Sequence, residues 1–429
     1  MLGLGNLHNR FSYNSSFMCL QALFSFSWFL KQSLHTLNGF LWVFMMIYAI
    51  GDLKIYCKNK VYLSDIFKLL ILQYLCGNIK ELSSPHTDMM VMLLVIYIIT
   101  RWVEFLEKEE KNYIPYGLLC LLGVFAVSVK LSAGLILILT LKPAIELVVK
   151  KKWKTIIVFI VSGIIIIFPF LVRNVMLSGY LIYPYANIDL FNVDWKMPAS
   201  QVIFDNHEIM AWGRLLNDVK RYFEPITVWL PIWLEKCGAV NRRLMLLNLC
   251  LLPVMIGMLL YSFYKKKYDQ SLIIMCCIAL FGAWFFTAPL PRYGAIYMYL
   301  LPSVLLFEVV RIMPYSISRA WKNIVCIMLV SIGMNLVQTM LDDADILKYG
   351  NRLVPKDYKE YSVEEILWND MVIYLPEDTD QVSYHNFPST PYRARLELIE
   401  LRGEGIEDGF RIKEEYKGRK VDTHGRFLE

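Results

Sequence analysis

Residues 155–172 read TIIVFIVSGIIIIFPFLV, a stretch without a single charged side chain. A helix needs about 17 to 25 such residues to cross the hydrocarbon core of a bilayer. The stretch follows the basic sequence KKKWK at 150–154 and ends at Arg173. Soluble cores rarely bury an uninterrupted apolar helix of this length, so residues 155–172 predict a membrane-spanning helix.

Comparable apolar runs recur as far as residue 341, and they predict an all-α polytopic membrane protein with about ten transmembrane helices. Several runs are short for a core of about 30 Å, which favours tilted or broken helices. The predicted spans are 37–53, 62–79, 88–103, 114–129, 131–149, 155–172, 244–264, 271–287, 296–310 and 324–341.

Two aromatic stretches fit the membrane interface better than a span. Residues 15–30 are apolar but do not fit the alternation of the spans. The second half of the loop 173–243 contains Trp212, Tyr222, Trp229 and Trp233 and predicts an amphipathic helix. Trp and Tyr rings are favoured at the headgroup level, so both stretches are expected to lie in the plane of the membrane.

The chain changes character after residue 341. Residues 1–341 contain 31 Lys and Arg against 18 Asp and Glu, a net charge of +13, whereas residues 342–429 contain 13 against 20, a net charge of −7. Short β-like runs alternate with turn signals in this acidic tail. We therefore expect an outer-face segment (1–36), a transmembrane domain (37–341) with an outer loop (173–243), and a small soluble tail domain with some β structure.

Five clusters of Lys and Arg between the spans set the expected orientation. They are Lys54, Lys58 and Lys60; Arg101, Lys108 and Lys111; Lys150 to Lys154; Lys265 to Lys267; and Arg311, Arg319 and Lys322. Placing all five in the cytoplasm gives a consistent alternation. This predicts a multi-pass inner-membrane protein with an extracytoplasmic C-terminus. The basic residues form no patch, so they give no evidence for nucleic-acid binding.

Two polar motifs at outer span ends are candidates for function, because polar groups near lipid are costly. Asp88 and His86 lie in SSPHTD at 83–88, just where a span begins. Asp88 either caps the helix or faces an external cavity as a base or metal ligand. Lys130 lies between two apolar runs and either extends to the membrane surface or holds a lipid phosphate.

Two arginines lie at further outer ends. Arg173, followed by Asn174, ends the span 155–172, and Arg292, followed by Tyr293, is the only charged residue of the turn APLPRY at 288–293. Each either anchors its helix at the interface or binds phosphate. A guanidinium suits phosphate better than an ammonium because it donates two parallel hydrogen bonds.

The motifs around these arginines carry a resemblance to a known family. A span that contains Pro169, then LVRN at 171–174 and SGYLIYP at 178–184, resembles the multi-spanning glycosyltransferases of the GT-C fold. Residues 83–88 and 291–293 look like equivalents of the outer-loop motifs of that group. Further segments are similar to a bacterial branch of it, namely residues 3–11, 14–16, 387–392, 402–403 and 409–411.

The resemblance implies transfer of a sugar from a polyprenyl-phosphate donor to an envelope glycan or lipid. It implies a catalytic carboxylate, phosphate-binding cations, supporting polar residues and no assigned metal ligands, although the chemistry is compatible with a divalent ion. The catalytic candidate is Asp88, the lipid-phosphate-binding candidates are Lys130, Arg173 and Arg292, and the supporting candidates are His86, Asn174 and Tyr293. The expected partners are the lipid bilayer, the donor and the acceptor.

One departure from the GT-C pattern is at the N-terminus. The usual catalytic Asp of that group follows a first span, whereas this chain opens in a stretch that resembles the middle of the first outer loop. The resemblance therefore implies an N-terminally shortened chain. Three alternatives stay open: a glycan polymerase or ligase, a non-catalytic membrane protein, and a lipid-linked glycan transporter. A transporter predicts an inverted repeat and ionisable residues at the bilayer midplane, and the sequence pattern shows neither.

Overall fold

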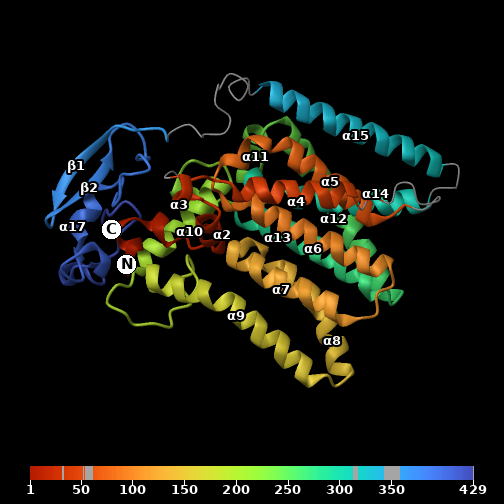
Figure 1. Cartoon of the computed structure of the whole chain (residues 1–429), viewed down its shortest axis with the longest axis horizontal. Coiled ribbons are helices and arrows are strands. Elements are labelled where there is room, and N and C mark those ends of the chain that lie inside the picture. Colours follow the sequence, from red (N-terminus) through yellow and green to blue (C-terminus); the bar gives the residue numbers. More distant parts are fainter. Residues whose placement is uncertain (31–32, 52, 54–60, 313–316, 343–357, 429) are drawn as a thin grey trace. The chain divides into compact units, whose positions relative to one another are not determined.

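The computed structural model describes residues 1–30, 33–51, 53, 61–312, 317–342 and 358–428, most of them in helices (Figure 1). The basic cluster at 54–60 and the side chain of Arg319 lie outside the described part. The chain forms two compact units. Unit 1 consists of residues 1–14, 168–226 and 353–429, and unit 2 consists of residues 15–167 and 227–352.

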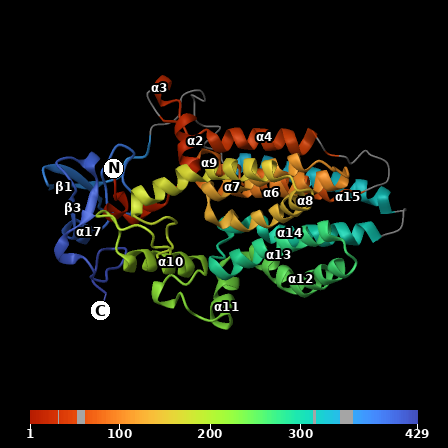
Figure 2. The ribbon, with the colours of Figure 1, turned by 90° about the horizontal axis from the view of Figure 1, so that it is seen from below.

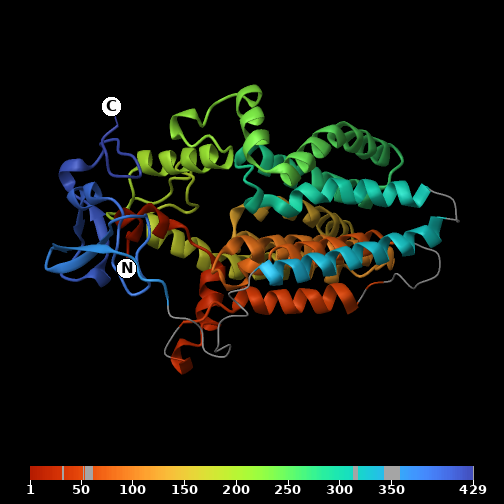
Figure 3. The same cartoon turned by 90° about the horizontal axis from the view of Figure 1, so that it is seen from above.

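Unit 2 is the helical part. Nine of the ten predicted spans each overlap one α-helix, whereas 131–149 covers a 3-10 helix followed by an α-helix. Neighbouring helices of this unit pack side by side, as α6 does with α7 and α12 does with α13 (Figures 2 and 3). The elements are α2 (Ser16–Leu23), α3 (Ser27–Leu30), α4 (Leu37–Gly51), α5 (Leu63–Gly77), η2 (Ile79–Ser83), α6 (Thr87–Glu107), α7 (Tyr113–Val129), η3 (Leu131–Thr140), α8 (Leu141–Val149), the first part of α9 (Trp153–Ser178), α11 (Ile226–Lys236), α12 (Ala239–Tyr264), α13 (Tyr268–Thr287), α14 (Pro291–Ile312) and α15 (Ile317–Asp342).

Six helical segments of the described chain are long and apolar enough to cross a membrane. They are Thr87–Glu107, Leu131–Val149, Trp153–Ser178, Ala239–Tyr264, Tyr268–Thr287 and Pro291–Arg311. The prediction of a helical membrane protein thus agrees with the structure, but a total of about ten spans is not confirmed. Helices α4 and α7 are shorter, with 15 and 17 residues, and α5 contains Asp65 and Lys68.

Three of the predicted basic loops meet at one end of unit 2. Lys111, Lys150 and Asp269 line one pocket of about 460 Å³ together with Lys142. The Nζ atom of Lys142 lies 2.5 Å from Oδ1 of Asp269, just beyond Lys265 to Lys267. The helix ends at these three loops therefore lie together, as the predicted alternation requires for them. The side of the membrane that this end faces stays a prediction.

Helices α5 and α6 bury a charged cluster that the sequence pattern did not reveal. Nζ of Lys68 lies 2.5 Å from Oε1 of Glu104, and these two side chains are 0 % and 2 % exposed. Arg101 also pairs with Glu104, although the sequence places it in a basic loop. Because a lone charge in an apolar interior is very costly, each charge needs its partner here.

The aromatic residues of α11 do not lie at the surface of unit 2. Trp229 is 2 % exposed and Trp233 is 0 % exposed. Trp233 donates a hydrogen bond from Nε1 to the carbonyl oxygen of Pro289, at 2.7 Å. These rings belong to the core, because they pack on Phe285 and Trp284 of α13 rather than facing headgroups.

Unit 1 joins the two ends of the chain to the loop between α9 and α11, and its C-terminal part contains two small antiparallel sheets, β1–β2 and β3–β4. Leu7 lies in the same apolar core as Ile373, Leu396 and Phe410. The N-terminal segment and the tail thus fold together, unlike the sequence-based division at residues 36 and 341. The elements are α1 (Leu4–Leu7), η1 (Asn9–Ser12), the end of α9, α10 (Ala199–Gly213), η4 (Val219–Arg221), β1 (Val363–Trp368), β2 (Met371–Pro376), α17 (Arg393–Leu398), β3 (Ile399–Leu401), η5 (Ile406–Asp408), β4 (Phe410–Ile412) and η6 (Glu414–Tyr416).

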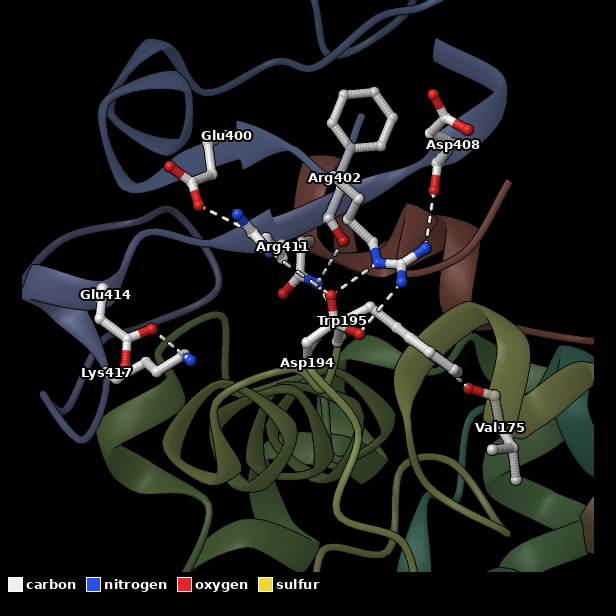
Figure 4. A network of polar contacts seen from close by, with 11 residues as sticks. Val175, Asp194, Trp195, Glu400, Arg402, Asp408, Arg411, Glu414 and Lys417 are labelled. Carbon is white, nitrogen blue, oxygen red and sulfur yellow. Dashed lines mark hydrogen bonds and ion pairs between the residues drawn. The ribbon is translucent and has the colours of Figure 1, made fainter. Parts of the chain in front are cut away.

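Polar contacts fasten the segments of unit 1 to one another. Figure 4 shows Asp194 bound through both carboxylate oxygens by Arg402, at 2.9 and 3.1 Å. The guanidinium of Arg402 also lies over the Trp195 ring, 4.9 Å from its centroid. The loop after α9 is thereby held against the tail.

A second polar contact is buried completely. Arg395 of α17 is 0 % exposed and donates to the carbonyl oxygens of Gly5, Asn6 and Thr423, at 2.9, 3.0 and 2.7 Å. Two of these carbonyls belong to α1, whose C-terminal carbonyl groups have no partner within the helix. Arg395 thus ties the N-terminal segment to the tail.

We predict that Arg395→Leu releases the N-terminal segment from the tail. Three buried carbonyls would lose their donor, at about 1–3 kcal/mol for each group left unsatisfied. Amide hydrogen exchange of residues 3–12 in the detergent-solubilised chain should show protection reduced by about 3 kcal/mol. Arg393→Leu is the control, since Arg393 lies on the same helix with its side chain 61 % exposed. Equal protection in both variants would contradict the prediction.

Candidate functional site

Asp88 receives two cations from two other elements of unit 2. Its carboxylate lies in the first turn of α6, and the whole residue is 3 % exposed. Nζ of Lys130 pairs with Oδ1, and Nε of Arg292 donates to Oδ2 at 2.7 Å. The structure therefore brings together the predicted catalytic carboxylate and two of the three predicted phosphate-binding cations.

The position of Asp88 follows from its place at the start of a helix. A carboxylate in the first turn is favoured by the positive end of the helix dipole. The residue that caps α6 is His86, whose side chain makes no capping hydrogen bond. Asp88 itself uses its oxygens on Lys130 and Arg292, so its contacts go beyond those of a capping residue.

Lys130 lies at the junction where α7 ends and η3 begins. Its backbone nitrogen still donates to the carbonyl oxygen of Ala126, at 3.0 Å, while its own backbone is extended. The side chain is 27 % exposed, and Nζ lies 4.0 Å from the centroid of the Tyr293 ring. Such a cation–π contact and the pairing with Asp88 direct the ammonium toward other residues of unit 2.

Two buried tryptophans fix the turn that presents Arg292. Trp284 donates from Nε1 to the carbonyl oxygen of Leu290 at 3.0 Å, and Trp233 donates to the neighbouring carbonyl of Pro289 at 2.7 Å. The side chain of Arg292 is 59 % exposed although its Nε is bound to Asp88. The outer edge of the guanidinium is therefore accessible to an anion, in the paired geometry that phosphate favours.

His86 lies between Asp88 and a second carboxylate, Glu81, that sequence reasoning missed. Nδ1 of His86 is 3.8 Å from Oδ2 of Asp88, and Nε2 is 3.1 Å from Oε2 of Glu81. Asn38 of α4 supports this loop by donating to the carbonyl oxygens of Ser84 and His86, at 2.9 and 3.2 Å. The alternation of the spans places Glu81, in the loop 80–88, on the same outer side as Asp88. This shared position is the sequence feature that could have identified Glu81 as a site residue.

Arg173 and Asn174 belong to unit 1, whereas the other candidate residues belong to unit 2. Asn174 is 1 % exposed and donates to the carbonyl oxygen of Leu181 at 3.0 Å, which holds the chain as it leaves α9. Arg173 is half-buried on α9. Convergence of Arg173 with Lys130 and Arg292 stays a prediction.

The geometry suits the binding of an anion. Lys130 and Arg292 both hold Asp88, and the guanidinium is the more exposed of the two cations. Among the described residues, no three His, Cys, Asp or Glu side chains are grouped to hold a metal ion. Lys130 and Arg292 are the two cations of this cluster that a phosphate could contact.

Residues 1–299 match the family described as "Domain of unknown function (DUF8201)". The chain belongs to this family. The matched region of this DUF8201 member includes all of the predicted site residues and Glu81, whereas residues 300–429 lie beyond it. No curated protein and no solved structure matches the chain.

We predict that Gly294→Ala disturbs the turn of Arg292. An added Cβ would lie 2.4 Å from two atoms of the Trp284 indole, which must move and weaken its bond to Leu290. Thermal unfolding in detergent should show a loss of about 1–3 kcal/mol. Gly282→Ala is the matched control on α13, because nothing lies within 4 Å of its added Cβ. An unfolding midpoint equal to that of the control would show that the indole adapts without strain.

Proposed function

We propose that this DUF8201 member is a GT-C-like glycosyltransferase that moves a sugar from a polyprenyl phosphate to an envelope glycan or lipid. The reaction would take place at the outer face of the bacterial inner membrane. The observation that supports it most is the buried carboxylate of Asp88 between Lys130 and Arg292. A base beside two phosphate-binding cations is what such a transfer requires.

In the proposed reaction a hydroxyl oxygen of the acceptor attacks the anomeric carbon of the donor sugar. The bond between that carbon and the phosphate oxygen breaks, and its electron pair leaves with the polyprenyl phosphate. Asp88 takes the proton of the hydroxyl group as general base. Lys130 and Arg292 stabilise the negative charge that develops on the phosphate, which is where fixed cations lower a barrier most effectively.

The pairing seen at Asp88 has a consequence for this chemistry. A carboxylate held by two cations is a weak proton acceptor, because the cations favour its charged form. A donor phosphate would compete for the same cations, beginning with the exposed guanidinium of Arg292. Donor binding would thus loosen the hold on Asp88 and make it a stronger base. Because of the GT-C resemblance, we propose that Arg173 binds the lipid phosphate as well.

A lipid-linked glycan transporter is the second candidate, and one observation favours it. The ion pair of Lys68 and Glu104 is buried between α5 and α6, with Asp65 Oδ1 4.0 Å from the same ammonium. Ionisable residues inside a membrane domain often mark a transport path. A glycan polymerase or ligase, the remaining enzymatic alternative, would also use outward arginines on a polyprenyl-linked substrate.

We predict that Asp88→Asn abolishes most of the transfer. Loss of the base should lower turnover by about 10²- to 10⁴-fold. Donor affinity should not fall, because Lys130 and Arg292 lose a competing charge. Turnover is measured as the release of polyprenyl phosphate from labelled donor, with the chain in nanodiscs. Donor affinity is measured by titration with the donor.

Asp269→Asn is the control for this variant, because Asp269 pairs with Lys142 at the other end of unit 2. Full turnover in Asp88→Asn would contradict the catalytic role of this carboxylate. Movement of intact lipid-linked glycan across the membrane of vesicles that contain the protein, without release of polyprenyl phosphate, would favour the transporter.

We also predict that Arg173→Lys raises the donor concentration needed for half-maximal transfer by about tenfold, which corresponds to about 1.4 kcal/mol. The ammonium keeps the charge but loses the two parallel hydrogen bonds to phosphate. The same release assay measures the change. Arg243→Lys, at an exposed position of α12, is the control. An unchanged donor dependence would identify Arg173 as an interfacial anchor.

A further inference from the structure

The imidazole of His86 lies between a buried carboxylate and an exposed one. Asp88 is 5 % exposed by its side chain, His86 is 10 % exposed, and Glu81 is 49 % exposed. The two ring nitrogens face the two acids separately, Nδ1 toward Asp88 at 3.8 Å and Nε2 toward Glu81 at 3.1 Å. These three side chains form a path from the interior of unit 2 to solvent.

The loop around His86 is held firmly, but the ring itself has unused hydrogen-bonding capacity. Asn38 fixes the backbone through the carbonyl oxygens of Ser84 and His86. Both ring nitrogens are buried and make no well-aligned hydrogen bond among the described residues. Buried polar atoms without a partner are rare and often belong to working sites, where contacts tighten during the reaction.

The charges around the ring favour its neutral form. Burial lowers the pKa of His86, and Arg292 and Lys130 lower it further, while Asp88 and Glu81 oppose them. A neutral imidazole has one nitrogen that accepts a proton and one that donates. It can therefore accept from one carboxylic acid and donate to the other carboxylate.

We propose that His86 and Glu81 conduct to solvent the proton that Asp88 takes from the acceptor, an inference that rests on the proposed function. Protonated Asp88 gives its proton to Nδ1 of His86, and the proton on Nε2 passes to Glu81, which releases it to water. One proton enters from the hydroxyl group and one leaves to solvent. Proton exchange with water, with no net gain or loss, then moves the remaining ring proton from Nδ1 back to Nε2 and restores the starting state. His86 and Glu81 act through Asp88 and position no substrate.

The path would remove from Asp88 a proton that this buried carboxyl group cannot easily lose to water directly. Lys130 and Arg292 favour the charged carboxylate, so Asp88 must lose its proton before both cations can return to it. Direct loss to water is hindered because the carboxylate is almost fully buried. Glu81, about half-exposed, is the carboxylate through which the proton reaches solvent.

Buffer rescue in the release assay tests the relay. Turnover of Glu81→Gln and of His86→Gly should fall at least about tenfold with donor affinity unchanged, and added imidazole should restore most of it. Glu146→Gln, which removes an acid paired with Lys150 elsewhere in unit 2, should need no rescue. Unchanged turnover in Glu81→Gln, or a loss that imidazole does not restore, would overturn the relay and leave the transferase proposal intact.

A measurement independent of turnover covers the case in which the wild-type chain releases no polyprenyl phosphate. That result would refute the proposed function, and the titration of His86 would then decide whether the ring is coupled to both acids. NMR of labelled imidazole, with the signal assigned by its loss in His86→Gln, should show a lower pKa of His86 in both Glu81→Gln and Asp88→Asn. A titration unmoved in either variant would overturn the path.

Discussion

The carboxylate of Asp88 lies among apolar helices, where an unpaired charge costs several kcal/mol. Its partners are far away in the sequence, since Lys130 is 42 residues and Arg292 is 204 residues distant. Pairing therefore joins the start of α6, the end of α7 and the start of α14 at one point. The tryptophans that hold the turn before Arg292 and the contact of Lys130 with Tyr293 support the same point. The geometry of the candidate site is thus a consequence of neutralising one buried charge.

The same requirement shapes other parts of the chain. Lys68 and Glu104 neutralise each other between α5 and α6. In unit 1, Asp205 accepts from Asn9 and Tyr183, both at 2.6 Å, and from Tyr13, while Arg395 donates to three carbonyls. Burial raises the pKa of Asp205 against the effect of its hydrogen-bond donors, and burial lowers the pKa of Arg395 to about 10. Because the partners come from both ends of the chain, unit 1 needs its N-terminal residues and its tail together.

Local sequence determines which of these features can be predicted. Apolar length alone located the helices, and the alternation of basic loops put Asp88, Lys130 and Arg292 at span ends on one side. The ion pair of Lys68 and Glu104 was not predictable from local sequence, because each residue is isolated among apolar neighbours. Only the packing of α5 on α6 brings the two side chains together. The burial of Trp233 was not predicted for a related reason, because sequence periodicity does not distinguish a helix face that contacts lipid from one that contacts protein. The shared core of Leu7 and Phe410 depends on tertiary contact over the whole chain length.

The two oxygens of Asp88 are not equivalent, and this orders the proposed events. Lys130 holds Oδ1 and is itself fixed by Tyr293, whereas Arg292 holds Oδ2 and is the more exposed cation. A phosphate would therefore engage Arg292 first and draw it away from Oδ2, leaving Lys130 in place. Oδ2 is also the oxygen that faces Nδ1 of His86. The oxygen that donor binding exposes for accepting a proton is thus the one from which His86 would remove it, so a single displacement of Arg292 would prepare both steps.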